Sequence, residues 1–162
     1  MFTRFGMTML LASGLAAADD NVEKTIRELY ASSQTAARNA RTSDDLRQAL
    51  STFAPEWVGH MPAAETITLA DLLKEGEAAL TIPPEKRPLP QIDFVYIRET
   101  GWNVLVVYWN SRRAGGRVIG SLCRDTWVRG ASGWKRISTE KMFPDRPLIE
   151  DGNPVVLPAG QN

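Results

Sequence analysis

Four alternating segments in the second half of the chain constrain its fold more than any other feature of the sequence. In each of them apolar and polar residues alternate, which is the period of a β-strand with one buried face. The segments read IDFVYIRE, NVLVVYWNS, GRVIGSLCRDTWVR and WKRISTEKMF. Short turns at 99–101, 113–116 and 130–133 separate them, and each turn contains glycine. Because such short connections join antiparallel neighbours, the pattern predicts a sheet built of successive hairpins.

Helical patterns precede the strands. From Asn21 to Ala40 apolar residues recur at helical spacing, after polar residues that can cap a helix start. The stretch TSDD predicts a second, short helix with Ser43 as its cap and Pro55 at its end, and Thr68 is expected to cap a third. Three helices followed by a curved antiparallel sheet predict an α+β fold with the helices packed on one sheet face.

The size and charge of the chain exclude some classes of partner. Its 162 residues suffice for one domain with a real core. Basic and acidic residues number 19 each, so there is no electrostatic reason to expect nucleic acid or an anionic membrane as partner.

The N-terminus has the order of a secretory signal. Arg4 is followed by an apolar run, by Ala16-Ala17-Ala18, and then by two acids. We expect residues 1–18 to be a signal peptide, cleaved after Ala18, of a periplasmic or secreted protein without membrane association once the signal is removed. The alternative is a buried N-terminal helix. The domain is then expected over 19–143, with an extended tail over 144–162.

The titratable side chains do not suggest a metal centre. Cys123 is the single cysteine and His60 the single histidine, so neither a disulfide within the chain nor a metal site is expected. No cofactor is expected either. Cys123 is interpreted as a small buried residue of a strand.

One hairpin carries a resemblance to a known family. The stretch CRDTWVRGASGWKRIS resembles the last hairpin of the nuclear transport factor 2-like (NTF2-like) superfamily, with the SnoaL-like and calcium/calmodulin-dependent kinase association-domain proteins as the closest branch. Three further stretches are similar to that family in the same order, namely FAPEWVGHMP, LADLLKEG and GWNVLVVYWN. The resemblance covers about residues 22–143.

The resemblance implies a cone, in which a bent sheet wraps around the helices and leaves a cavity at its open end. It implies that Trp127 and Trp134 form a cross-strand pair, which would stabilise the hairpin by about 0.2–1 kcal/mol. It also implies a ligand, a small hydrophobic molecule, or a cofactor-independent isomerase or lyase reaction of the ketosteroid isomerase-like kind. The alternative function is a non-catalytic homodimeric interaction or ligand-sensing module.

The pocket residues follow from alternation together with the resemblance. Alternation groups Tyr108 with Asn110, and Cys123 with Asp125 and Trp127, while the resemblance turns both groups toward the cavity. In the association domains the counterpart of Asp125 is basic, so their anion-binding role is not carried over. The resemblance places a basic residue in the pocket at Lys141. On the last strand two registers remain open. A regular ladder sets Asp125 opposite Arg136, whereas a bulge near Arg136 turns Ile137, Thr139 and Lys141 inward.

A catalytic constellation is available among these residues. Asp125 could act as the base beside a carbonyl and Tyr108 as the donor to its oxyanion. His60, the single histidine, is expected at the cavity rim, where an imidazole could act as an acid or a base. Each has a structural alternative: Asp125 as an ion-pair partner of Arg136 or Lys141, Tyr108 as a core aromatic, and His60 as an exposed or packed residue.

Two further predictions concern Trp57 and the outward face of the sheet. Trp57 could be a lid on the pocket or a plug in the core. The outward face of the second long strand, with Leu105, Val107 and Trp109, is the feature that favours a homodimer.

Overall fold

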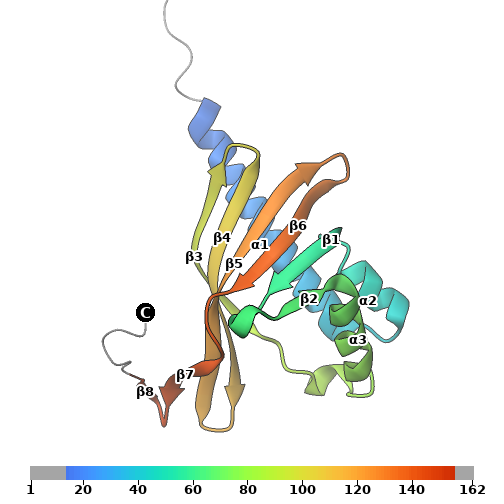
Figure 1. Cartoon of the computed structure of the whole chain (residues 1–162), viewed down its shortest axis with the longest axis vertical. Helices are drawn as coiled ribbons and strands as arrows, with labels where there is room; N and C mark the ends of the chain where they lie inside the picture. The colour runs from blue at the N-terminus through green and yellow to red at the C-terminus, as the bar shows by residue number, and fades with distance from the viewer. Residues whose placement is uncertain (1–13, 156–162) are drawn as a thin grey trace, which may run out of the picture.

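The chain folds as helices against one large sheet, and the computed structural model describes residues 14–155, with side chains from residue 21 onward (Figure 1). The helices are α1 (Gly14–Asn39), α2 (Ser43–Ala49) and α3 (Leu69–Ala79), with 3-10 turns at Pro62–Ala64 and Pro84–Lys86. The strands are β1 (Phe53–His60), β2 (Thr66–Thr68), β3 (Gln91–Thr100), β4 (Asn103–Ala114), β5 (Arg117–Gly130), β6 (Gly133–Lys141), β7 (Arg146–Glu150) and β8 (Asn153–Pro154).

The sheet follows the predicted order of hairpins and adds β1, β2, β7 and β8 to it. Its path is β2-β1-β6-β5-β4-β3, and β3 to β6 pair as successive antiparallel neighbours, as expected. The expectation of a wholly antiparallel sheet is wrong, because β1 pairs with β6 in parallel. This pairing is possible because the long connection through α3 and four strands, β2 to β5, returns the chain beside β1. The structure is therefore α+β with a mixed, curved sheet.

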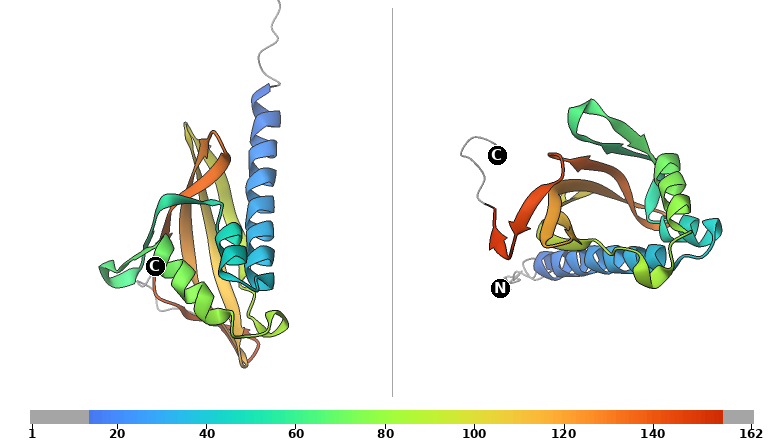
Figure 2. Two further views of the ribbon diagram at one scale, coloured as in Figure 1. Left: turned by 90° about the vertical axis from the view of Figure 1, so that its right-hand side faces the viewer. Right: turned by 90° about the horizontal axis from the view of Figure 1, so that it is seen from below.

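Helix α1 lies along one face of this sheet, which we call the inner face (Figure 2, left). Its Ile26 and Tyr30 pack on inner-face residues of β4 and β5. These are Val104, Val106, Tyr108, Cys123 and Trp127, all buried. The alternation predicted for both strands is confirmed, because it is this face that carries the core.

Helix caps follow the local sequence closely. Thr42 caps α2 with a capping box to Asp45, so the expected cap, Ser43, is wrong by one residue. Thr68 caps α3 as expected, with the same reciprocal bonds to Asp71. Pro55 does not end a helix but lies within β1. In both boxes a hydroxyl accepts an N–H that the helix leaves free, which is why a threonine three residues before an acid is sufficient to start each helix.

Arg87 joins three segments at the base of the helices. It is 8% exposed, and its guanidinium donates to carbonyl oxygens of Arg38, Ala40, Leu80 and Ile82. The carbonyl of Arg38 lies in the last turn of α1, that of Ala40 follows α1 and that of Leu80 follows α3, and unpaired carbonyls at helix ends carry partial negative charge. A buried cation therefore fixes the proline-rich loop 81–90 against both helices.

The described residues after β6 extend the sheet. Residues 146–150 form β7, which pairs with the start of β5 and with β8. Phe143 and Arg146 pack on Trp109, on the face of the sheet away from α1. The predicted signal boundary after Ala18 falls within the bounds of α1, and residues 1–13 lie outside the described part. In that part, none of the helices has the length and hydropathy needed to span a membrane.

Candidate functional site

Asp125 lies at the centre of a buried polar cluster inside the cone. Its side chain is fully buried, and Oδ2 accepts hydrogen bonds from the hydroxyls of Tyr30 and Tyr108, the latter at 3.2 Å. Trp127 Nε1 donates to the Tyr30 hydroxyl at 3.2 Å. The other oxygen, Oδ1, is buried and accepts no hydrogen bond from the described residues. The two phenols and the indole thus form one chain of hydrogen bonds that ends on the carboxylate.

The charge of Asp125 is balanced by Arg136. The Arg136 Nε lies 3.1 Å from Asp125 Oδ2, and the two side chains are 11% and 0% exposed. Since the Nε–H is not aligned for a hydrogen bond, the contact is an ion pair held by proximity. The guanidinium carbon lies 4.4 to 4.9 Å from the ring centres of three aromatic residues, Tyr30, Phe53 and Trp127. These rings add cation–π attraction to the ion pair.

A bulge on β6 places Arg136 in this position. Trp127 pairs with Arg136, and the register then shifts, so that Asp125 pairs with Thr139 and Cys123 with Lys141. The predicted bulge is confirmed, and both the regular ladder and the Trp127–Trp134 pair are wrong: Trp134 pairs with Arg129. Ile137 is the extra residue, and it lets β6 present Arg136, Thr139 and Lys141 to one face.

Burial dominates the acid–base properties of this cluster. Burial raises the pKa of Tyr30 and of Tyr108 well above the ordinary phenol value, with Asp125 adding to both shifts. Burial disfavours the charged form of Arg136, but the negative charge of Asp125 holds the pKa of that guanidinium above its usual value. At neutral pH the phenols are therefore hydrogen-bond donors and Arg136 is a cation.

A cavity of about 270 Å³, the proline-loop cavity, lies beside this cluster. It is lined by Pro88 and Pro90 from the loop before β3, by Asn110, Ser111 and Arg112 of β4, and by Ile119, Lys141 and Asp145. Asp145 bridges its two cations: Oδ1 lies 2.7 Å from Lys141 Nζ, and Oδ2 lies 3.2 Å from Arg112 Nη1. Of the predicted pocket residues, Asn110 and Lys141 line this cavity.

Cys123 separates the cavity from the Asp125 cluster. It pairs with Tyr108 on β4 and with Lys141 on β6, and it is 5% exposed. Burial raises the pKa of its thiol to about 11, with a further rise from Asp125. The thiol is thus protonated at neutral pH and behaves as the small buried residue that the sequence predicts.

The structure does not bring His60 to the Asp125 cluster. His60 pairs with Glu140, which pairs with Arg124, whereas the neighbouring row joins Gly59, Thr139 and Asp125. Because adjacent rows project to opposite faces, the exposed His60 lies on the outer face, away from Asp125.

Trp57 lies in the interior as a plug and not as a lid. It is 3% exposed, its Nε1 donates to Thr139 Oγ1 at 3.2 Å, and its ring packs on Phe53.

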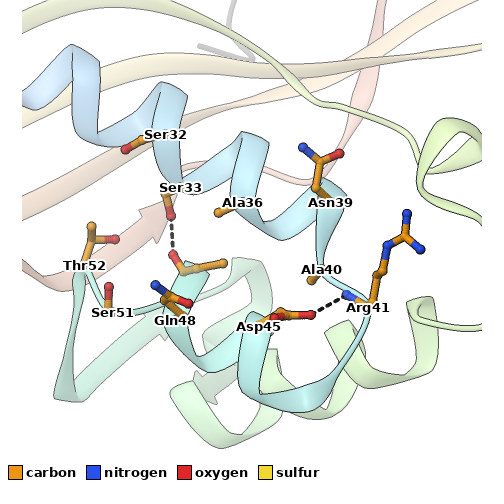
Figure 3. Close-up of a pocket in the computed structure, with 11 residues that line it drawn as sticks. Ser32, Ser33, Ala36, Asn39, Ala40, Arg41, Asp45, Gln48, Ser51 and Thr52 are labelled. Carbon is orange, nitrogen blue, oxygen red and sulfur yellow. Dashed lines mark hydrogen bonds between the residues drawn. The ribbon is translucent and has the colours of Figure 1, made fainter.

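Three other cavities lie outside this site. One of about 490 Å³ lies between α1 and α2, where Ser32, Gln48, Ser51 and Thr52 face the same hollow and Ser33 bonds to the Ala49 carbonyl (Figure 3). Cavities of about 760 and 350 Å³ border Leu89, on the β7 side and on the α3 side. Neither Asp125, Tyr108 nor Cys123 lines any of these four cavities. Among the described residues, no group of three or more His, Cys, Asp or Glu side chains is placed to hold a metal ion.

Sequence reasoning missed three residues that matter here. Tyr30 was expected only as part of a helix face, and Arg112 and Asp145 were not singled out. Helical spacing from Ile26 signals that Tyr30 is buried, but its partner lies 95 positions away. Asp145 is four residues after Lys141, and such proximity is a usable signal only once the strand is known to end there.

Comparison with solved structures identifies the fold. A conserved protein from Planctomyces limnophilus aligns with a TM-score of 0.60 at 17% identity, over 79% of this chain and 98% of that one. An NTF2-like protein of unknown function from Pseudomonas putida aligns at 0.54 and 13% identity, over 86% and 98%. A protein from Parabacteroides distasonis proposed to be a ketosteroid isomerase aligns at 0.52 and 15% identity, over 75% and 86%. No family model and no curated protein sequence matches the chain.

The chain has the NTF2-like fold, as the resemblance implied: three helices on a curved sheet whose inner face is closed by α1. At these identities the comparisons define the fold alone, and the SnoaL-like or association-domain branch stays a prediction.

Proposed function

We propose that the protein binds a small organic molecule in the proline-loop cavity. One observation carries this: the cavity joins an apolar wall, Pro88, Pro90 and Ile119, to the polar side chains of Asn110 and Lys141 at the end of the inner face. Small-molecule sites combine apolar lining with polar groups that fix orientation, and here the polar groups also include Ser111, Arg112 and Asp145. A volume of about 270 Å³ suits a ligand smaller than most drugs.

The packing favours binding without chemistry. Asp125, the predicted base, is fully buried and lines none of the cavities described above, and its contacts are with the chain's own Tyr30, Tyr108 and Arg136. The catalytic form of the proposal is a cofactor-independent isomerase or lyase that uses Asp125 and Tyr108. It requires a substrate to reach past Cys123, and it predicts that Asp125→Asn abolishes turnover.

Native mass spectrometry of the purified protein tests the binding proposal. We expect the native chain to carry a co-purified small molecule or to bind an amphiphile from a mixed set. Ile119→Trp should bind neither, because an indole fills the cavity in that variant. Ile149→Trp is the matched control, because Ile149 is 37% exposed and lies outside the proline-loop cavity. Equal binding to all three proteins would contradict the proposal, as would binding to none.

Export is a separate part of the proposal. The signal-like residues 1–18 support a periplasmic or secreted protein whose mature chain starts at or near Asp19. Intact mass of the exported protein tests this, and a soluble exported product that retains Met1 would refute it.

A homodimer through the outer face is the second candidate role. Tyr96 pairs with Val107 on that face and is 40% exposed, and Met142, bonded to Leu122, is 50% exposed. Val107 itself is buried and Trp109 is covered by Phe143 and Arg146, so it is the exposed apolar side chains of Tyr96 and Met142 that support a contact with another protein on this face.

A further inference from the structure

We propose that the proline-loop cavity takes a small carboxylate, and that Asp145 competes with this ligand for Lys141 and Arg112. This inference rests on the proposed function and names its ligand class. It follows from the charges of the cavity and from the place of Asp145 in the chain.

The charges of the cavity favour an anion. Its charged lining residues are Arg112, Lys141 and Asp145, which leave one unit of positive charge. A ligand carboxylate would meet the Lys141 ammonium and the Arg112 guanidinium, both of which make strong charge-assisted hydrogen bonds to carboxylates. The apolar wall of Pro88, Pro90 and Ile119 would cover the body of such an acid.

Asp145 already makes the contacts that such a ligand would make. One of its oxygens lies on each cation, at 2.7 and 3.2 Å, so its carboxylate occupies the position that binds a carboxylate best. The side chains of Lys141 and Asp145 are only 25% and 30% exposed, whereas that of Arg112 is 54% exposed. A ligand carboxylate therefore has to displace the Asp145 carboxylate from Lys141 and Arg112, because neither cation is free.

The backbone around Asp145 allows this exchange. Asp145 lies between β6 and β7, outside both strands. The segment is held before it, where Met142 N bonds to Leu122 O and Ser121 Oγ donates to Phe143 O, and after it by the pairing of Arg146 with Gly120. The Asp145 side chain can thus turn away by rotation about its own bonds while both flanking anchors remain.

Benzoate and its neutral isostere benzamide are suitable probes, with binding measured by calorimetry on the purified protein. We expect Asp145→Asn to bind benzoate about five- to tenfold more tightly than the native chain, because the internal competitor is neutralised. Lys141→Gln and Arg112→Gln should each weaken benzoate binding by a similar factor, and Lys141→Arg should restore it. Arg112→Gln changes an exposed residue and so keeps the test open if the Lys141 variant does not fold. Binding of benzamide should not respond to any of these changes.

The outcomes separate this inference from the proposed function. Benzoate binding that falls in Asp145→Asn would overturn the competition, because Asp145 would then help to hold the ligand. Benzamide binding that is blocked by Ile119→Trp, without any preference for benzoate, would overturn the carboxylate class and keep the proposed function. Failure of both probes and of every amphiphile in the mixed set would overturn both.

Discussion

Neutralising Asp125 should destabilise the fold far more than neutralising a carboxylate on the other face of the same strands. In Asp125→Asn the Arg136 cation, 11% exposed, loses its counter-charge and keeps only the three aromatic rings. Removing one partner of a buried ion pair costs about 3–5 kcal/mol. The remaining cation–π contacts offset part of this loss, so we expect the free energy of unfolding to fall by about 3 kcal/mol.

The matched control is Glu140→Gln. Glu140 forms an ion pair with Arg124 across the same two strands, but these side chains are 42% and 47% exposed on the outer face. An exposed pair contributes about 0.2–1 kcal/mol, so this change should be small.

The double variant tests whether the cluster acts as a unit. Arg136→Met alone leaves the Asp125 carboxylate buried with two phenol donors and should cost as much as Asp125→Asn. Together the two changes remove both charges, so the double variant should be more stable than the sum of the single effects predicts, by about 2 kcal/mol or more. Urea unfolding followed by tryptophan fluorescence measures all four variants. Additive losses, or a loss in Asp125→Asn no larger than in Glu140→Gln, would refute the reasoning. Unchanged ligand affinity in Asp125→Asn would support a role in the fold, whereas a loss of affinity or turnover with little change in stability would support the catalytic form.

Four further predictions follow from particular contacts. Arg87→Met should lower the free energy of unfolding by about 3 kcal/mol, because the four carbonyl oxygens that Arg87 contacts lose a charged donor. The control Lys86→Met changes an exposed residue and should alter the free energy of unfolding by less than about 0.5 kcal/mol, and urea unfolding measures both variants. Gly120→Ala should lower the free energy of unfolding by about 1–3 kcal/mol, because the added Cβ would lie 2.6 Å from the Asn110 carbonyl oxygen. In the control Gly116→Ala, in the same hairpin, the added Cβ meets no atom nearer than 3.6 Å, and equal melting temperatures of the two variants would contradict the prediction. Burial raises the pKa of Cys123 from the ordinary 9 to about 11, so the folded chain holds the thiol proton more tightly than the unfolded chain does. The resulting contribution to stability is complete below about pH 9 and is lost as the pH rises to about 11. The midpoint of urea unfolding should therefore fall less over that pH range in Cys123→Ala than in the native chain. Tyr96→Glu should yield a monomer in light scattering if the outer face forms a dimer, and Trp109→Glu should do the same while also loosening Phe143; an unchanged mass at low protein concentration would rule out that surface.

Local patterns in the sequence predicted most of the elements. The two-residue period of 91–141 located four strands to within three residues at each end, because alternation and glycine turns act within a few positions of the chain. Helix starts were equally local: Thr68 was predicted correctly, and Thr42 was missed by one position because either hydroxyl satisfies the pattern. The same alternation correctly grouped Cys123 with Asp125 on one face of their strand, and the resemblance turned that face and Tyr108 inward, where all three are buried.

The tertiary structure alone decided what those inward residues contact. The parallel pairing of β1 with β6 joins segments some 80 positions apart, and it places His60 on the opposite face from Asp125. The extra residue of β6, Ile137, sets which side chains face inward, and a bulge depends on neighbouring strands more than on its own sequence. Tyr30 closes over Asp125 from α1, and Asp145 meets Arg112 across 33 positions. Within an unbulged strand the period of the segment groups residues on one face, so the sequence determines that grouping, but a bulge and the partner of a buried charge depend on how distant segments pack.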